Sequence, residues 1–131
     1  MIHVSDLKKT YNGTTVLQIE NLDIPQGQSF GLVGNNGAGK TTFFSLLLDL
    51  IRPTTGRITT NNIQINISEE WKKFTSSFID ETFLIGYLTP EEYFYFIGEL
   101  RGWNKADVDA FLKNYEDFFN GEILNNKKYL R

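Results

Sequence analysis

The segment from Gly34 to Thr41 limits most strongly how this chain can fold. It reads Gly-Asn-Asn-Gly-Ala-Gly-Lys-Thr and fits the spacing G-x-x-x-x-G-K-[ST]. The apolar run Ser29–Val33 before it predicts a buried strand, with Phe30–Val33 as its core. The segment Lys40–Ile51 after it is apolar on nearly every side, which predicts a helix buried in a core. The glycine-rich segment must therefore form a loop between a strand and a helix.

A loop of this composition is suited to bind a triphosphate. Its N–H groups can turn inward because glycine tolerates backbone angles that a Cβ atom would oppose. The helix start at Gly39 and Lys40 adds unpaired N–H donors and a positive dipole end. We expect Lys40 to contact the β- and γ-phosphates and the Thr41 hydroxyl to bind Mg²⁺. The candidate phosphate-binding residues are Gly34, Asn35, Asn36, Gly37, Ala38, Gly39, Lys40, Thr41 and Thr42. The alternative is a glycine-rich turn with an exposed lysine.

Composition excludes several other classes of site. The chain of 131 residues has no Cys and one His, which excludes disulfides, thiolate catalysis and Cys-based or His-rich metal sites. A net charge of −3 does not favour a nucleic-acid partner, because such domains usually carry a basic excess. The longest apolar stretch, Phe43–Ile51, is far shorter than the roughly 20 residues that cross a bilayer. We therefore expect a soluble chain that binds anions through a local site.

The first half of the chain predicts β-structure on both sides of the loop. Residues Met1–Ile24 predict two antiparallel strands joined at Asn12-Gly13. Residues Arg57–Ile67 predict a second hairpin around Asn61-Asn62, and Phe74–Ile79 predicts a further strand.

The second half predicts helices. Pro90 opens a helix with Thr89 as its cap, and Gly102 ends it. Apolar spacing from Lys105 to Phe119 predicts an amphipathic helix, and the last ten residues predict a loop and one short turn.

Three segments together resemble the amino-terminal half of an ATP-binding cassette (ABC) ATPase, the nucleotide-binding domain of ABC transporters. They are the glycine-rich loop, the preceding Leu7-Lys-Lys-Thr-Tyr-Asn-Gly13 and the following Leu50-Ile-Arg-Pro-Thr-Thr-Gly-Arg-Ile58. The resemblance implies an α/β P-loop NTPase fold of ABC type, with antiparallel β hairpins, a partial parallel core sheet and the start of a helical subdomain. It assigns an incomplete ATP-binding core to residues 1–88 and the start of the helical subdomain to residues 89–131.

The resemblance also implies ATP and Mg²⁺ as cofactors and adds two site residues. An aromatic residue on the family's first hairpin stacks on adenine, and Tyr11 stands in the matching position; the alternative is a surface tyrosine that packs in a turn. A family glutamine that contacts Mg²⁺ falls at Asp80, with Glu81 beside it. A carboxylate can bind Mg²⁺ but brings negative charge toward the triphosphate, so Asp80 is a candidate metal ligand together with Thr41.

The sequence departs from the family in its catalytic elements. It contains no Leu-Ser-Gly-Gly-Gln-like signature run and no apolar strand that ends in Asp-Glu with a continuation suitable for a Walker B motif. Its histidine, His3, lies on the first strand, whereas the family's switch histidine lies far downstream. The chain ends at Lys127–Arg131, where the signature loop is expected to begin. We therefore interpret the chain as a fragment that binds ATP without hydrolysing it.

The resemblance further implies partners for the full-length protein. They are a second copy of the ATPase domain, in a head-to-tail dimer, and a membrane-spanning transporter subunit, with the ATPase at the cytoplasmic face of the membrane. The aromatic-rich segment Tyr93–Ile97 and Trp103 either pack the helical subdomain or meet the membrane subunit. A soluble ABC-type ATPase of translation or repair remains an alternative, as does a nucleotide-binding module without catalysis. A P-loop GTPase is a further alternative because Asn104-Lys-Ala-Asp107 matches N-K-x-D, although Asn104 also suits a helix cap.

Overall fold

The structure, a computed structural model, describes residues 1–124 of the chain. Its contacts divide the chain into two compact units, Met1–Ile79 and Asp80–Arg131, which are described separately below. Most of the loop expected over the last ten residues lies outside the described residues. The functional division expected after residue 88 stays a prediction, because a division by contacts does not test it.

A long antiparallel hairpin begins the first unit. Strand β1 (Ile2–Tyr11) pairs with β2 (Thr14–Ile24) from Ile2 opposite Ile24 to Tyr11 opposite Thr14. Asn12 and Gly13 in the turn have φ angles of 48° and 81°, the left-handed values that a tight hairpin turn requires. The hairpin predicted for this region is confirmed.

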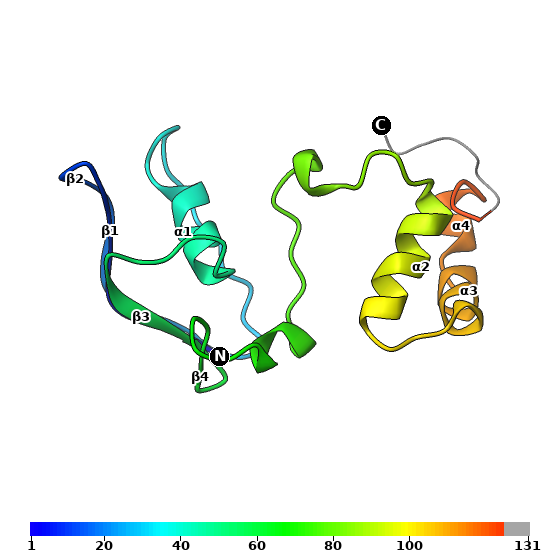
Figure 1. Cartoon of the computed structure of the whole chain (residues 1–131), viewed down its shortest axis with the longest axis horizontal. Helices are drawn as coiled ribbons and strands as arrows, with labels where there is room; N and C mark the ends of the chain where they lie inside the picture. The colour runs from blue at the N-terminus through cyan, green and yellow to red at the C-terminus, as the bar shows by residue number, and fades with distance from the viewer. Residues whose placement is uncertain (125–131) are drawn as a thin grey trace. The chain divides into compact units, whose positions relative to one another are not determined.

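A second hairpin extends the same sheet. Strand β3 (Thr55–Thr60) pairs with β1 on the side away from β2, and β4 (Ile63–Gln64) pairs with β3. Asn61 and Asn62 form the turn with φ angles of 48° and 64°, as predicted for this hairpin. The result is a four-stranded antiparallel sheet in the order β2-β1-β3-β4 (Figure 1).

Helix α1 (Lys40–Leu47) covers one face of this sheet (Figure 1). Its buried side chains Phe43 and Leu46 pack with side chains from the sheet and from the short helix η1 (Glu70–Phe74). The buried core consists of Val4, Leu7, Phe43, Leu46, Ile58, Ile65 and Trp71. The Trp71 indole N–H donates to the Ile65 carbonyl oxygen at 3.0 Å, which fixes η1 to the segment after β4.

Helix α1 is shorter than predicted. It ends at Leu47 and not at Ile51, because Leu48 caps it and Asp49 takes a left-handed φ of 54°. The uniformly apolar sequence gave no sign of this end, since burial continues beyond the helix.

Two predicted strands do not form among the described residues. Residues 30–33 and 74–79 contain no strand; Val33 is 94% exposed and Phe78 is 72% exposed. A strand needs a hydrogen-bonded neighbour, and the described sheet offers neither segment one. The partial parallel core sheet expected from the resemblance is therefore not present in the described part of the chain.

The second unit is helical. After the short helix η2 (Glu81–Phe83) come α2 (Pro90–Leu100), α3 (Lys105–Lys113) and α4 (Glu116–Phe119). Thr89 and Glu92 form a complete capping box at α2, as do Asn104 and Asp107 at α3. The helix start and cap predicted at Thr89 and Pro90 are confirmed, and so is the interpretation of Asn104 as a cap.

Helices α2 and α3 approach closely at Gly98. A Cβ atom there would lie 2.4 Å from Val108 Cγ2, so glycine permits this packing. The single helix predicted from Lys105 to Phe119 is wrong in one respect, because the helical backbone is interrupted at Asn114 and Tyr115 and resumes as α4. No helix in residues 1–124 combines the length and the apolar character that a membrane crossing requires.

The sheet predicts a sharp difference between two glycine substitutions. Gly13 and Gly56 have nearly equal φ angles of +81° and +82°, but only at Gly56 would a Cβ atom meet backbone, 2.3 Å from the Asp6 carbonyl oxygen. Gly13→Ala should cost about 1–2 kcal/mol of unfolding free energy from strain alone. Gly56→Ala should cost about 2–5 kcal/mol, because overpacking is added.

Urea unfolding followed by the fluorescence of the buried Trp71 measures both losses. Trp103 is replaced by Phe in every variant, so that the fluorescence reports on the first unit alone. Equal losses for the two substitutions would contradict the packing of β3 against β1.

Candidate phosphate-binding site

The loop that leads into α1 depends on two glycines. Gly37 and Gly39 have φ angles of +83° and +84°, in the left-handed region that side chains disfavour. At Gly39 a Cβ atom would also lie 2.8 Å from the Val16 carbonyl oxygen of β2. Gly39 therefore lets the loop turn into α1 while it lies directly against the first hairpin.

The start of α1 leaves backbone donors unused. Gly39 is the N-cap residue and provides no side-chain cap, and the first hydrogen bond of the helix joins the Phe43 N–H to the Gly39 carbonyl at 2.8 Å. In the described part of the chain, the N–H groups of residues 39–42 have no acceptor. Unpaired N–H groups at a helix start, together with the positive end of the helix dipole, form a site for an anion.

The Lys40 side chain brings positive charge to the same loop. Its Nζ atom donates to the carbonyl oxygens of Gly34 and Asn35 at 2.6 and 2.8 Å. The Ala38 N–H donates to the backbone carbonyl oxygen of Asn35 at 3.1 Å, which closes a turn inside the loop. An ammonium group has three donors, so one remains for a ligand after these two bonds. The backbone carbonyl groups of the loop thus hold the Lys40 ammonium group against the loop.

Thr41 lies in the first turn of α1 and is exposed. Within residues 1–124 its hydroxyl has no hydrogen-bond partner, so its oxygen is free to bind a cation. A hydroxyl oxygen beside a phosphate site is a suitable Mg²⁺ ligand. The donors, the lysine and this hydroxyl therefore fit a triphosphate with bound Mg²⁺.

Asp80, the other predicted metal ligand, belongs to the second unit. Its carboxylate accepts hydrogen bonds from both the N–H and the hydroxyl of Thr82 and caps η2. Glu81 is exposed in the first turn of η2. These local contacts show what holds Asp80 in place, and the metal role of either acid stays a prediction.

Tyr11 lies at the end of β1 with its side chain 48% exposed. It pairs with Thr14 at the start of β2, and Gly39 lies against Val16 and Leu17 of the same strand. The turn end of the first hairpin therefore carries Tyr11 and also adjoins the loop. That Tyr11 and the loop form one site stays a prediction.

Lys9 is a residue that the sequence analysis missed. Its Nζ atom lies 4.6 Å from the centre of the Tyr11 ring and donates to the Arg52 carbonyl oxygen at 2.8 Å. A signal was present in the sequence, because residues two apart on a strand face the same side. Using that signal requires knowing that Lys9 and Tyr11 belong to one regular strand.

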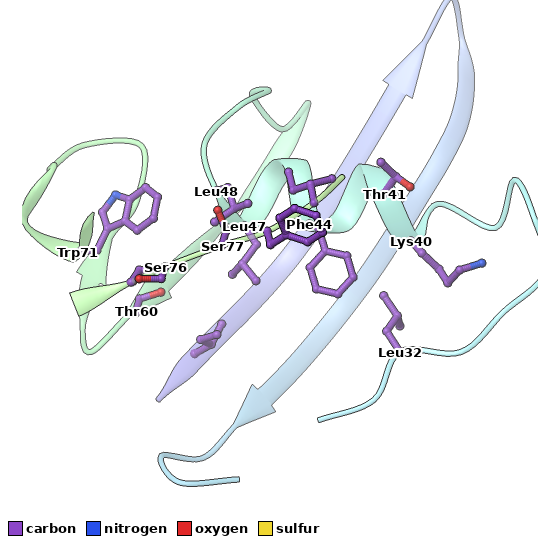
Figure 2. A pocket seen from close by; sticks show the side chains of 14 residues that line it. Leu32, Lys40, Thr41, Phe44, Leu47, Leu48, Thr60, Trp71, Ser76 and Ser77 are labelled. Carbon is purple, nitrogen blue, oxygen red and sulfur yellow. The ribbon is translucent and has the colours of Figure 1, made fainter. Parts of the chain in front are cut away.

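A cavity of about 590 Å³ lies beside α1. Figure 2 shows Lys40 at one end of it and Trp71 at the other, with Phe44 and Leu47 of α1 between them. The lining is mostly apolar, although Lys40 and Thr41 at one end of the cavity also belong to the candidate phosphate site.

Residues 17–129 match the family model described as ABC transporter. Among curated proteins, the bacitracin transport ATP-binding protein BcrA of Enterococcus faecalis is 38% identical over 116 residues, which cover 86% of this chain. The aligned part makes up 37% of BcrA, so this chain spans less than half the length of that relative.

Solved structures agree with the sequence match. A structure described as the ATP-binding subunit of an ABC transporter superposes with a TM-score of 0.78 and 28% identity, over 93% of this chain and 51% of the other. A dimeric ATP-binding cassette in a post-hydrolysis state, bound to ADP and Pi, superposes with a TM-score of 0.65 and 25% identity, over 77% of this chain and 48% of the other. The chain belongs to the ABC transporter ATP-binding family and has the P-loop NTPase fold of its amino-terminal part.

Proposed function

We propose that this chain binds Mg-ATP through residues 34–42. The observation that carries the proposal is the set of unpaired N–H groups at residues 39–42 beside the Lys40 ammonium group. Both are donors, and both lie where the loop enters α1, so a β- or γ-phosphate could accept from them together. The relative bound to ADP and Pi is consistent with a nucleotide as the anion.

The metal is proposed to bind at the Thr41 hydroxyl. When bound, Mg²⁺ neutralises part of the phosphate charge and bridges phosphate oxygens. Thr41 lies one residue after Lys40, so its exposed hydroxyl is next to the proposed phosphate position. We retain Asp80 as a second proposed ligand, with Glu81 as the alternative to it.

The adenine base is proposed to stack on Tyr11. The ring is half exposed, and the end of the hairpin that carries it adjoins Gly39 through β2. Stacking of a base on an aromatic side chain is worth about 1–3 kcal/mol in single-stranded nucleic-acid complexes. That contribution would favour ATP over a bare polyphosphate.

For the full-length protein we propose an ATPase that drives transport through a membrane-spanning partner. The relatives described as transport ATP-binding proteins support this proposal, as does the dimeric cassette for a second copy of the ATPase domain. Association with the membrane partner would place the protein at the cytoplasmic face of the membrane. The soluble ABC-type and GTPase alternatives are not favoured by these relatives.

Removing the Lys40 ammonium should weaken Mg-ATP binding. Charge-assisted hydrogen bonds contribute about 1.5–3 kcal/mol, so Lys40→Ala should lower the affinity roughly 10- to 150-fold. Calorimetric titration of the 131-residue chain measures this, with phosphate release recorded in parallel.

Lys73→Ala is the matched control, since it removes the same charge from an exposed pair with Glu70. Equal affinity in Lys40→Ala and the unaltered chain would overturn the proposed site.

The increase in ATP affinity that Mg²⁺ causes should depend on the Thr41 hydroxyl. Thr41→Ala removes the proposed ligand oxygen, so Mg²⁺ should raise ATP affinity less in this variant than in the unaltered chain, whereas Thr41→Ser should keep the response. ATP titrations with Mg²⁺ and with a chelator give the ratio for each variant. An unchanged ratio in Thr41→Ala would rule out the hydroxyl as a ligand.

Removing the Tyr11 ring should lower the affinity for ATP but not the affinity for tripolyphosphate, which lacks the base. Tyr11→Ala should lower ATP affinity roughly 5- to 150-fold, the range of base stacking, and leave inorganic tripolyphosphate affinity unchanged. Tyr11→Phe should preserve both because the ring remains. Competition titrations with the two ligands provide the comparison, and a parallel loss of both affinities would argue against stacking.

A further inference from the structure

We infer that Lys9 is a positioning residue for the base, because its ammonium group covers one face of the Tyr11 ring and leaves the opposite face for adenine. The inference rests on the proposed stacking of adenine on Tyr11. It assigns a role to a side chain that lies outside the phosphate-binding loop.

The strand geometry places the two side chains together. Lys9 pairs with Leu17 and Thr10 pairs with Thr15, so the unpaired extra residue of this hairpin is Val16 in β2. Strand β1 is therefore regular from Lys9 to Tyr11, and side chains two residues apart share a face. The Lys9 Nζ atom accordingly lies 4.6 Å from the ring centre, within the range of a cation–π contact.

The position of the ammonium group is fixed from the other side. Lys9 Nζ donates to the Arg52 carbonyl oxygen at 2.8 Å. Two hydrogen bonds also join the segment that carries this carbonyl to β1. The Thr54 N–H donates to the backbone carbonyl oxygen of Lys8 at 2.8 Å, and the Thr10 N–H donates to the Thr54 hydroxyl at 2.9 Å. Lys9 is thus held between a fixed carbonyl and the Tyr11 ring.

This arrangement has a consequence for ligand binding. A half-exposed tyrosine at a hairpin end would otherwise lose rotational freedom when a base stacks on it, and that loss opposes binding. Lys9 restrains the ring before the base arrives and blocks one of its two faces. A base can then stack only on the face turned away from Lys9, which sets a single orientation.

The test is a comparison of Lys9→Met with Lys8→Met in the 131-residue chain. Both remove one ammonium group, but Lys8 precedes Lys9 on the strand and so faces the other side of β1, and it makes no cation–π contact with Tyr11 in the described residues. Lys9→Met should weaken ATP binding about 2- to 5-fold, as expected for an exposed cation–π contact, and leave tripolyphosphate affinity unchanged. Lys9→Arg should restore ATP affinity, and Lys8→Met should change neither.

A double-mutant cycle identifies the route of the effect. In a Tyr11→Ala background, Lys9→Met should cause no further loss of ATP affinity, since its partner is absent. A further loss there, or an equal loss of tripolyphosphate affinity, would show that Lys9 acts on the phosphates or on the loop and would overturn the inference. No effect of Lys9→Met on ATP binding would overturn it as well.

Failure of the proposed function gives a different result. In that case the unaltered chain binds neither ATP nor tripolyphosphate, or Lys40→Ala binds both as well as the unaltered chain does. Normal binding that depends on Lys40 but not on Lys9 would overturn only the role of Lys9.

Discussion

The structure of the site depends on the close contact between Gly39 and the Val16 carbonyl of β2. The contact leaves no space for a side chain at the helix cap, where Gly39 also has a left-handed φ of 84°. Ser, Thr, Asp or Asn at an N-cap would satisfy an N–H group of the first turn with its own side chain. Glycine cannot, so the N–H donors in the first turn of α1 stay unpaired within the described chain. Helices α2 and α3 show the contrast, because each has a complete capping box.

The same contact joins three parts of the chain that are distant in sequence. Val16 is the extra residue of the first hairpin, so the bulge in β2 adjoins the loop, while Tyr11 lies on the strand paired with β2. Segment 52–54 after α1 is bonded to β1 beside Lys9. The hairpin, the loop and the segment after α1 are therefore joined to one another around the proposed phosphate and base positions.

The sequence predicted those features that local residues determine. Asn12-Gly13 and Asn61-Asn62 specify left-handed turns, and Thr89-Pro90 specifies a helix start, so each was predicted correctly. The backbone of the glycine-rich loop was also predictable, because the spacing requires glycines with unusual backbone angles and Gly37 and Gly39 have left-handed φ angles. Its binding of phosphate stays a prediction. The prediction of a strand at residues 30–33 was wrong for a different reason. Its apolar pattern indicates burial between neighbours, and no neighbouring strand lies within the described residues.

Side-chain partners in the site were less predictable. The bonds from Lys40 to Gly34 and Asn35 depend on how the loop closes, and the contact of Lys9 with Tyr11 depends on which hairpin strand carries the bulge. Neither is encoded by spacing alone. The apolar cavity beside α1 also escaped prediction, since it reflects which faces of the helix the sheet leaves uncovered.

The central claim is that backbone N–H groups at the start of α1 bind the phosphates, and amide NMR spectra of the 131-residue chain test it directly. Addition of Mg-ATP or tripolyphosphate should shift the amide proton resonances of residues 39–42 downfield, because each gains a charged acceptor. Amides of α3 serve as the internal reference, since that helix already has its cap. Saturable binding without a shift at residues 39–42 would contradict the account.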